Sequence, residues 1–356
     1  MGLKRRHVMA ALRALSIGLI LVFVATAAAG SPDLWRSEGW KTDFGKSLMP
    51  LSEIVSGGVG KDQIPSIDQP KFEKAAAISR YGDREPVIEL QVGATARAYP
   101  LSILTWHEIV NDVVEGRPVA ITYCPLCNAS NVFDRRLGGQ VLDFGTTGKL
   151  RKSDLVMYDR QTETWWQQFT GDAIVGRQKG RSLKMIPSRV VAYSDFRKRH
   201  PGGDVLVPTD ASSRPYGRNP YVAYDSGQTP YALVRCRLPG NINPMARVVI
   251  VRRDDAVVAV SLDHLRKKGR VELDDMRISW VEGVASALDR DEISRGREVG
   301  AVEAVDAASR EMLVADVTFA FVLFAFHPGV LVLTDKGRLT LEAQQPARKQ
   351  NSRGAF

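Results

Sequence analysis

Two stretches of this chain of 356 residues share one pattern of apolar residues, and this internal repeat limits the available folds more than any other feature. Residues 86–104, PVIELQVGATARAYPLSIL, align without a gap on residues 247–265, RVVIVRRDDAVVAVSLDHL, and their apolar positions coincide. Each copy predicts two short strands joined by a tight turn, at Gly93-Ala94 in the first copy and at Asp254-Asp255 in the second. A chain with such a repeat is expected to fold as two related halves.

The similarity continues beyond this stretch with small changes in length. Residues 119–135 align with residues 277–290, and a His-Pro-Gly tripeptide closes both copies, at 200–202 and at 327–329. We therefore predict a β-rich α+β fold of two fused, diverged repeats, built of β-hairpins and meanders with short helices. The predicted parts are a signal peptide (1–29), an N-terminal lead-in (30–79), repeat 1 or copy one (80–208), a loop-rich linker (209–244), a degenerate repeat 2 or copy two (245–335) and a flexible tail (336–356).

The N-terminus predicts export from the cytoplasm. Lys4, Arg5 and Arg6 precede an apolar run at 14–29, ALSIGLILVFVATAAA, that ends in small residues. A basic start, a short apolar run and an Ala-x-Ala-like end are typical of a secretory signal peptide. The run is shorter than the roughly 20 residues that a membrane span needs, so an uncleaved anchor is the weaker interpretation. We expect a periplasmic or extracellular protein with no transmembrane span after signal removal.

Charge and cysteine content exclude two classes of protein. The formal net charge is +9, and four of the positive charges lie before residue 30, which leaves +5 for the exported chain. The basic residues are scattered and form no block interleaved with aromatics, so we expect no nucleic-acid partner. Three cysteines are too few for a fold built on disulfides.

The strongest functional signal is a Cys-x-x-Cys pair, Cys124 and Cys127, with His107 upstream. Two strand-like segments flank Glu115-Gly116. If that dipeptide is a two-residue turn, the hairpin register places His107 directly opposite Cys124. Cross-strand neighbours lie roughly 5 Å apart, close enough to share one metal ion. We predict that Cys124, Cys127 and His107 bind a thiophilic metal: copper, zinc or iron.

Zinc would need a fourth ligand, for which Met157, Asp134, Glu108 and Asp112 are candidates by proximity in the sequence. A c-type haem is not expected, because Asn128 follows Cys127 where a haem attachment motif has histidine. Copy two has neither the cysteines nor the histidine at the aligned positions. The fold therefore does not require these three residues.

Two other hypotheses use the same cysteine pair. A thiol–disulfide oxidoreductase would use Cys124 as the attacking thiolate, Cys127 as the resolving thiol and His107 as the base. A structural or interaction module would use the pair only as a disulfide. Two predicted hairpins, turning at Gly138-Gly139 and near Gln161-Thr162, place the pair in a β-meander and argue against a thioredoxin fold. Under the first two hypotheses we expect a periplasmic redox or metal-delivery partner.

An apolar segment at residues 317–326, VTFAFVLFAF, occupies the place of a charged segment in copy one, YSDFRKRH. It is too short to span a bilayer and apolar on all sides, so it must be buried. We predict that it is the inner wall of an interface between the two copies.

Several segments resemble a family of exported bacterial and archaeal proteins that is known only as a domain of unknown function. WHEIVND at 106–112, YCPLCN at 123–128 and MYDRQT at 157–162 match the signature of that family, and the similarity covers about residues 80–335. The resemblance implies no established reaction, so the activity has to be inferred from the residues.

Overall fold

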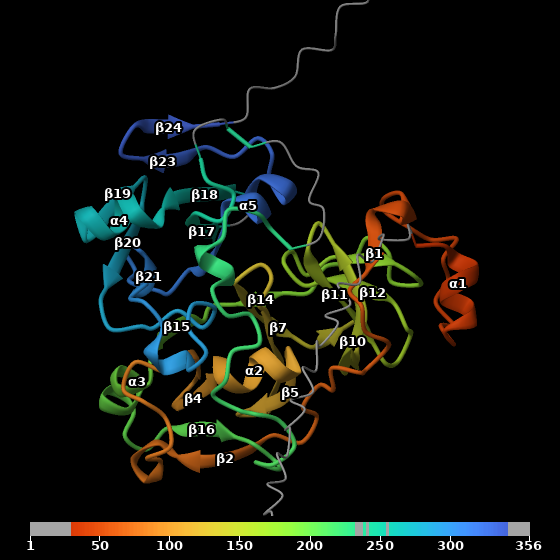
Figure 1. The fold of residues 1–356 in the computed structure, drawn as a ribbon, viewed down its shortest axis with the longest axis horizontal. Coiled ribbons are helices and arrows are strands. Elements are labelled where there is room, and N and C mark those ends of the chain that lie inside the picture. Colours follow the sequence, from red (N-terminus) through yellow and green to blue (C-terminus); the bar gives the residue numbers. More distant parts are fainter. Residues whose placement is uncertain (1–29, 232–237, 240–241, 254–255, 341–356) are drawn as a thin grey trace, which may run out of the picture.

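The structure is a computed structural model that describes residues 30–231, 238–239, 242–253 and 256–340. The predicted signal peptide, the expected turn at Asp254-Asp255 and residues 341–356 of the tail lie outside the described residues. The described chain is β-rich with a few short helices, and its small sheets lie in a ring that resembles a five-bladed propeller (Figure 1). No helix in the described ranges is long and apolar enough to cross a membrane.

Two of the sheets have the same plan. The copy-one sheet has the order β15-β3-β4-β16-β2 and consists of β2 (Lys71–Lys74), β3 (Pro86–Val92), β4 (Thr95–Pro100), β15 (Arg189–Ala192) and β16 (Asp204–Val207). The copy-two sheet has the order β22-β17-β18-β23-β24 and consists of β17 (Arg247–Arg253), β18 (Ala256–Ser261), β22 (Val314–Phe319), β23 (Val332–Thr334) and β24 (Gly337–Leu339). In both sheets a central antiparallel hairpin is joined by one parallel strand from the end of the same copy.

The helices recur at matching places. A helix and a second hairpin follow the central hairpin in each copy: α2 (Leu101–His107), β5 (Ile109–Val114) and β6 (Arg117–Cys124) in copy one, and α4 (Leu262–Lys268), β19 (Arg270–Leu273) and β20 (Met276–Val281) in copy two. Helices α3 (Tyr193–Arg199) and α5 (Ala320–Phe326) follow β15 and β22. This correspondence is compatible with the predicted repeat, and the origin of the two halves by duplication remains a hypothesis.

The copies differ after the second hairpin. Copy one continues with β7 (Ala129–Asp134), β8 (Arg136–Leu137), β9 (Gln140–Val141), β10 (Phe144–Arg151), β11 (Asp154–Asp159), β12 (Trp165–Gln167), β13 (Ala173–Val175) and β14 (Met185–Ile186). In the same interval, the described part of copy two has the single strand β21 (Ala301–Asp306). Copy one therefore contains strands that are additional to the shared plan.

These strands complete two sheets that meet at the cysteine pair. The CxxC sheet has the order β14-β7-β6-β5. The outer sheet has the order β1-β10-β11-β12-β13, in which β1 (Ile54–Ser56) comes from the N-terminal lead-in. A three-stranded sheet, β19-β20-β21, and the small hairpin β8-β9 complete the set. Outside the sheets lie α1 (Pro32–Ser37) and the 3₁₀ turns η1 (Leu51–Glu53), η2 (Ala75–Ala77), η3 (Tyr224–Ser226) and η4 (Ile293–Arg295).

The short-range turn predictions are confirmed. Strands β5 and β6 pair in the expected register around Glu115-Gly116, whose φ angles of 47° and 74° are those of a two-residue turn with left-handed residues. Strands β8 and β9 turn at Gly138-Gly139, and β11 pairs with β12 as the second predicted hairpin. The cysteine pair therefore lies in a β-meander, as expected.

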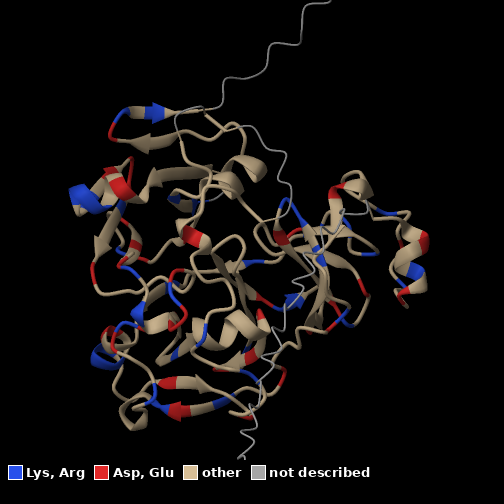
Figure 2. Cartoon of the chain, in the orientation of Figure 1, with Lys and Arg blue, Asp and Glu red and all other residues tan. Residues whose placement is uncertain are grey.

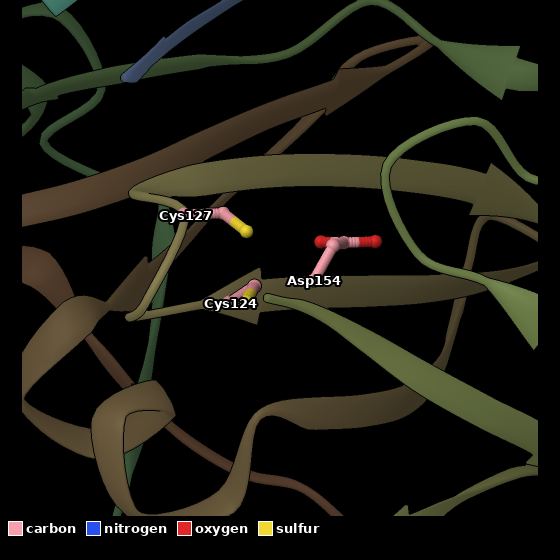
Figure 3. A group of neighbouring side chains, drawn as sticks. All are labelled: Cys124, Cys127 and Asp154. Atoms are coloured by element: carbon pink, nitrogen blue, oxygen red, sulfur yellow. The ribbon is translucent and has the colours of Figure 1, made fainter. Parts of the chain in front are cut away.

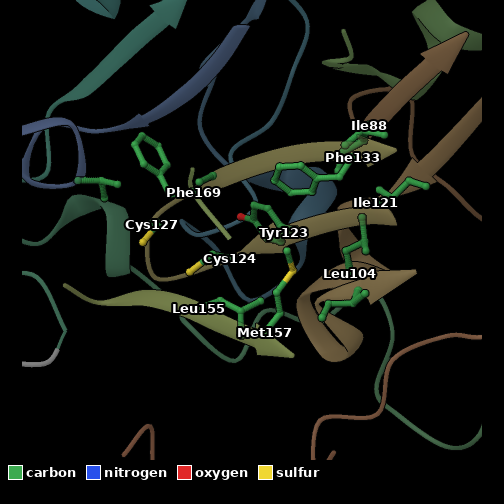
Figure 4. Packing of buried hydrophobic residues seen from close by; sticks show 14 of the residues in the cluster. Ile88, Leu104, Ile121, Tyr123, Cys124, Cys127, Phe133, Leu155, Met157 and Phe169 are labelled. Atoms are coloured by element: carbon green, nitrogen blue, oxygen red, sulfur yellow. The ribbon is translucent and has the colours of Figure 1, made fainter. Parts of the chain in front are cut away.

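Burial of the apolar segment at 317–326 is confirmed for residues 318–325, while Val317 and Phe326 are partly buried. Its helical part, α5, has residues 320–324 at most 2% exposed, and they belong to one hydrophobic cluster with the cysteine pair and with β17 of copy two. Figure 4 shows the copy-one side of this cluster, where Cys124 and Cys127 lie among Tyr123, Leu155 and Phe169. The two copies thus share one core, and α5 is part of it.

The described residues near the chain ends pair with strands of the main sheets. The lead-in is part of the fold, because β1 pairs with β10 and β2 pairs with β16. The first residues of the predicted flexible tail form β24, which pairs with β23. Basic and acidic residues alternate along the same elements (Figure 2). Many of them form ion pairs, as the buried Glu89 does with Arg189 and Arg199.

Candidate metal centre

The cysteine loop is a tight connection between β6 and β7. Cys124 pairs with Ala129 across the hairpin, and the Cys127 N–H donates to the Cys124 carbonyl at 3.2 Å. The Asn128 N–H donates to the Pro125 carbonyl, and Asn128 adopts a left-handed φ of 50° that closes the loop. Asparagine tolerates this conformation better than most residues. The loop brings the two cysteines close together without a helix after them.

A second tight turn meets the cysteine loop. Lys152 and Ser153 join β10 to β11 with φ angles of 55° and 63°, both left-handed. Non-glycine residues adopt this conformation at a cost in free energy, so it persists where the surroundings hold it and is frequent at functional sites. The Ser153 carbonyl oxygen lies 3.9 Å from the Cys124 sulfur and 3.4 Å from the Cys127 sulfur. The turn thus places the start of β11, Asp154, beside both cysteines.

Cys124, Cys127 and Asp154 form a group of potential metal ligands. The two sulfurs and a carboxylate oxygen all lie within 4.8 Å of one another, and all three residues are buried (Figure 3). Asp154 Oδ2 accepts hydrogen bonds from Gln167 Nε2 at 2.6 Å and from the Phe169 N–H at 2.9 Å. Its Oδ1 has no hydrogen-bond partner among the described residues. The carboxylate is held in place, and one oxygen remains available to a cation.

Burial disfavours the ionised forms of Cys124, Cys127 and Asp154. It raises the pKa of both cysteine thiols, with further increases from the nearby Asp154 carboxylate. Burial also raises the pKa of Asp154 to about 6, although the hydrogen bonds from Gln167 and Phe169 lower it. Ionised side chains are therefore unfavourable here without a compensating positive charge, which a bound metal ion would supply.

The prediction for His107 was wrong about the local structure. The register of β5 and β6 is as expected, but His107 is the last residue of α2 and not a strand residue. Its Nδ1 lies 2.7 Å from the Pro65 carbonyl oxygen and its Nε2 lies 2.7 Å from the Tyr216 hydroxyl. Both ring nitrogens are thus engaged, and the group of nearby ligand atoms contains Asp154 and not His107.

The four residues considered as a fourth ligand differ in their surroundings. Asp112 is bonded to Arg97 and Tyr99, and Asp134 to Arg117 and Arg136, so both carboxylates already have cationic partners. Met157 is fully buried in the hydrophobic cluster that contains the cysteines.

Glu108 is the exception among these four. It is 9% exposed, and its carboxylate makes no hydrogen bond or ion pair with a described residue. Burial and the charge of Asp154 raise the pKa of Glu108 to about 8. Its backbone has a left-handed φ of 59°, and its carbonyl accepts from the Tyr123 N–H, next to Cys124. Glu108 is thus a strained, buried acid beside the group.

Copy two and the linker cover the cysteine loop. The Cys127 carbonyl accepts from the Thr318 hydroxyl at 2.7 Å, and Asn128 Nδ2 donates to the Val317 carbonyl at 2.6 Å. The Tyr224 hydroxyl, in the linker, donates to the Leu126 carbonyl at 2.9 Å. Arg252 of copy two donates to the carbonyl of Phe169, whose N–H binds Asp154, and burial lowers the pKa of this guanidinium. The candidate centre is therefore built by copy one and enclosed by the rest of the chain.

Asp154 and Arg252 are the residues that the sequence interpretation missed. The segment FGTTGKLRKSDL carries only a weak signal of a phosphate loop, and its glycines and lysines instead belong to strand β10 and the turn after it. A two-residue turn at Lys152-Ser153 carries no glycine or asparagine that would indicate it. Arg252 lies far from the cysteines in the sequence, and no local pattern connects them.

The comparisons with known proteins give a family but no activity. A family model described as a protein of unknown function (DUF3179) matches residues 61–330. No curated protein and no solved structure matches the chain. The matched region includes both cysteines, Asp154, Glu108 and Arg252. Because the match covers well over half of its length, the chain belongs to the DUF3179 family of proteins of unknown function.

Proposed function

We propose that this protein binds a divalent thiophilic metal ion, zinc in the first place, through Cys124, Cys127 and Asp154. The observation that carries the proposal is the buried group of two thiols and one carboxylate oxygen, all within 4.8 Å of one another. Zinc–sulfur bonds of about 2.3 Å and zinc–oxygen bonds of about 2.0–2.2 Å require ligand atoms roughly 3.5–4 Å apart. Small rotations of the three side chains would reach that separation.

Charge balance favours a divalent over a monovalent ion. Two thiolates and the Asp154 carboxylate carry three negative charges, and a divalent ion leaves one of them uncompensated. The Arg252 guanidinium interacts with Asp316 and, through the backbone of Phe169, with Asp154, so it offsets part of that remaining charge. Cu(I) would leave two of the three negative charges uncompensated. It also prefers sulfur ligands to a carboxylate. Zinc and Fe(II) suit a mixed sulfur and oxygen set better.

Glu108 supports the proposal as a fourth ligand or as a base beside a bound water. A zinc site that keeps one position for water typically has three protein ligands. A bound cation would lower the pKa of Glu108 from about 8, and the resulting carboxylate could accept a proton from that water. Substituting Glu108 with Gln would separate the two roles, since only loss of a ligand weakens metal binding.

The redox hypothesis is less consistent with the geometry. Reactive cysteines are usually partly exposed and have a lowered pKa, whereas Cys124 and Cys127 are buried and the pKa of each thiol is raised. The disulfide hypothesis also remains, and the two cysteines are free thiols in this structure.

We further propose that the protein acts outside the cytoplasm and receives its ion from a delivery partner or while it folds, because the ligands are enclosed.

The test is metal content measured by mass spectrometry on the full chain purified without added metal and after zinc loading. We expect about one zinc ion per wild-type chain, and a large loss in Cys124→Ser, Cys127→Ser and Asp154→Asn. His107→Gln is the matched control, because it should keep the ion if Asp154 is the third ligand. Loss of zinc in His107→Gln but not in Asp154→Asn would favour the ligand set predicted from the sequence. Absence of any metal from folded wild-type protein would refute the proposal.

A further inference from the structure

A cavity with a few polar groups in a mainly apolar wall lies between the two copies, separate from the candidate metal ligands. Its volume is about 50 Å³, and its lining comes from β6, β7 and β15 of copy one and from β17, β21 and β22 of copy two. Most of the wall is apolar, as at Leu101, Val190 and Val302. A cavity of this size has room for about four water molecules, or for one organic molecule of a few heavy atoms.

Three buried polar atoms on the lining residues have no hydrogen-bond partner among the described residues: Tyr123 Oη, Asp316 Oδ2 and Arg247 Nε. Tyr123 is 1% exposed and Asp316 is 5% exposed. Buried polar groups nearly always have partners in folded proteins, so three unpartnered atoms around one cavity indicate that a molecule belongs in it.

The rest of each charged side chain is fixed by the fold. Asp316 Oδ1 accepts from the Ser130 N–H at 3.1 Å and from the Val317 N–H at 2.8 Å. Arg247 Nη2 donates to Asp225 Oδ2 and to Ser286 Oγ, both at 2.8 Å. Because these contacts hold the two side chains, the unpartnered atoms cannot turn away to find other partners. The cavity is thus a built site with a preset pattern of groups.

The pattern defines the ligand chemistry. Arg247 Nε is a donor, Tyr123 Oη can donate or accept, and Asp316 Oδ2 accepts when ionised. The charge of Arg247 is already balanced by Asp225, and that of Arg189 by Glu89 and Glu303, so the described lining offers no unpaired cation to hold an anion. The charge of Asp316 is offset by the Arg252 guanidinium, so the site does not need a cationic ligand either. A ligand that fits has one acceptor and one donor, no net charge and few atoms.

We propose that this cavity binds a small uncharged molecule of the primary amide type, whose carbonyl accepts from Arg247 and Tyr123 and whose NH₂ group donates to Asp316. A planar amide presents both functions from adjacent atoms, and its apolar remainder faces the apolar wall. The site is of the kind in which an apolar pocket with few convergent polar groups selects its ligand. None of the three proposed metal ligands lines the cavity, so the site is separate from the candidate metal centre.

The test uses acetamide as the probe, with acetone as an isosteric control that lacks the donor and acetate as a charged control. Crystals of the full chain soaked in acetamide should show it within hydrogen-bond distance of Asp316 and Tyr123. Solution binding, followed by protein-observed NMR, should be saturable. Acetone and acetate should bind roughly tenfold more weakly or not at all. Acetone has no donor for Asp316, and acetate carries a negative charge like that of Asp316.

Tyr123→Phe should weaken acetamide binding by roughly fivefold to tenfold, because it removes one hydrogen bond while keeping the ring. Asp316→Asn is the second variant and should also weaken binding, since its amide cannot offer the same acceptor in a fixed orientation. Water alone in the soaked cavity, or equal binding of acetamide and acetone, would overturn the proposal. Both of these results are measured on wild-type protein, so the proposal can be tested even if a variant fails to fold. Zinc content is measured in parallel, so failure of this site and failure of the metal proposal are distinguishable.

Discussion

Replacing a phenylalanine of α5 tests whether this helix joins the two copies. Phe324 is 2% exposed and lies in the hydrophobic cluster that also contains Cys124 and Cys127. Truncation to Ala should cost about 3–5 kcal/mol of the free energy of unfolding, from lost burial and the cavity left behind. Phe324→Asp adds an unpaired buried carboxylate, worth several kcal/mol more. Since domains are stable by about 5–15 kcal/mol, we expect the Asp variant to be largely unfolded.

The assay is urea unfolding followed by tryptophan fluorescence, with size-exclusion chromatography to confirm the oligomeric state. Leu331→Asp is the matched control, because Leu331 follows α5 closely and is 48% exposed. Its unfolding free energy should change by no more than about 0.5 kcal/mol. If Phe324→Asp stays folded and monomeric while it loses association with a membrane or another protein, α5 is a docking surface and the shared-core interpretation is wrong.

Three other substitutions test the metal site, a buried acid and a turn. Cys127→Ser should abolish zinc uptake under the metal proposal, whereas under the redox hypothesis it should trap a mixed disulfide on Cys124, which non-reducing mass spectrometry detects. Burial raises the pKa of Glu85 to about 7, so the folded state holds this proton more tightly than the unfolded chain; the stabilisation is complete below pH 4.5 and is lost as the pH rises through 7. Glu85→Gln should remove that decline and be more stable than wild type at pH 8 by up to about 3 kcal/mol in urea unfolding, and an unchanged pH profile would contradict it. Glu115→Asn should place an Asn-Gly pair in the exposed left-handed turn and raise the unfolding free energy by about 0.5–1 kcal/mol. A lower urea midpoint would show that the turn preference of residue 115 does not determine the stability of this hairpin.

Features set by neighbouring residues could be predicted from the sequence. The register of β5 and β6 follows from one turn, because a two-residue loop with left-handed residues at Glu115-Gly116 fixes which residues pair on the two strands. The hairpin at Gly138-Gly139 was predictable for the same reason, since glycine adopts a left-handed φ without strain. In each case the signal and the structure lie within about ten residues of each other.

The error at His107 arose from extending a correct register too far. Extending the register by number would pair His107 with Cys124, but the strand begins only at Ile109. Glu108 has a left-handed φ, and the residues before it are helical. The helix is stabilised by burial of Leu101, Ile103 and Leu104 and not by an amphipathic pattern. A short helix buried on all sides has no period that separates it from a strand. Its end, and thus the direction of the His107 ring, could not be predicted locally.

Asp154 could not be found from the sequence because its role depends on how two sheets pack. The outer sheet contributes the turn at Lys152-Ser153, and the CxxC sheet contributes the cysteine loop; the two meet only after the strands between them have formed. The described part of copy two has one strand where copy one has β7 to β14, and it therefore has neither element. It supplies instead Arg252, the backbone contacts of Val317 and Thr318, and the apolar helix α5. Under the metal proposal, the two copies therefore have different roles: copy one provides the ligands, and copy two encloses them and contributes a positive charge.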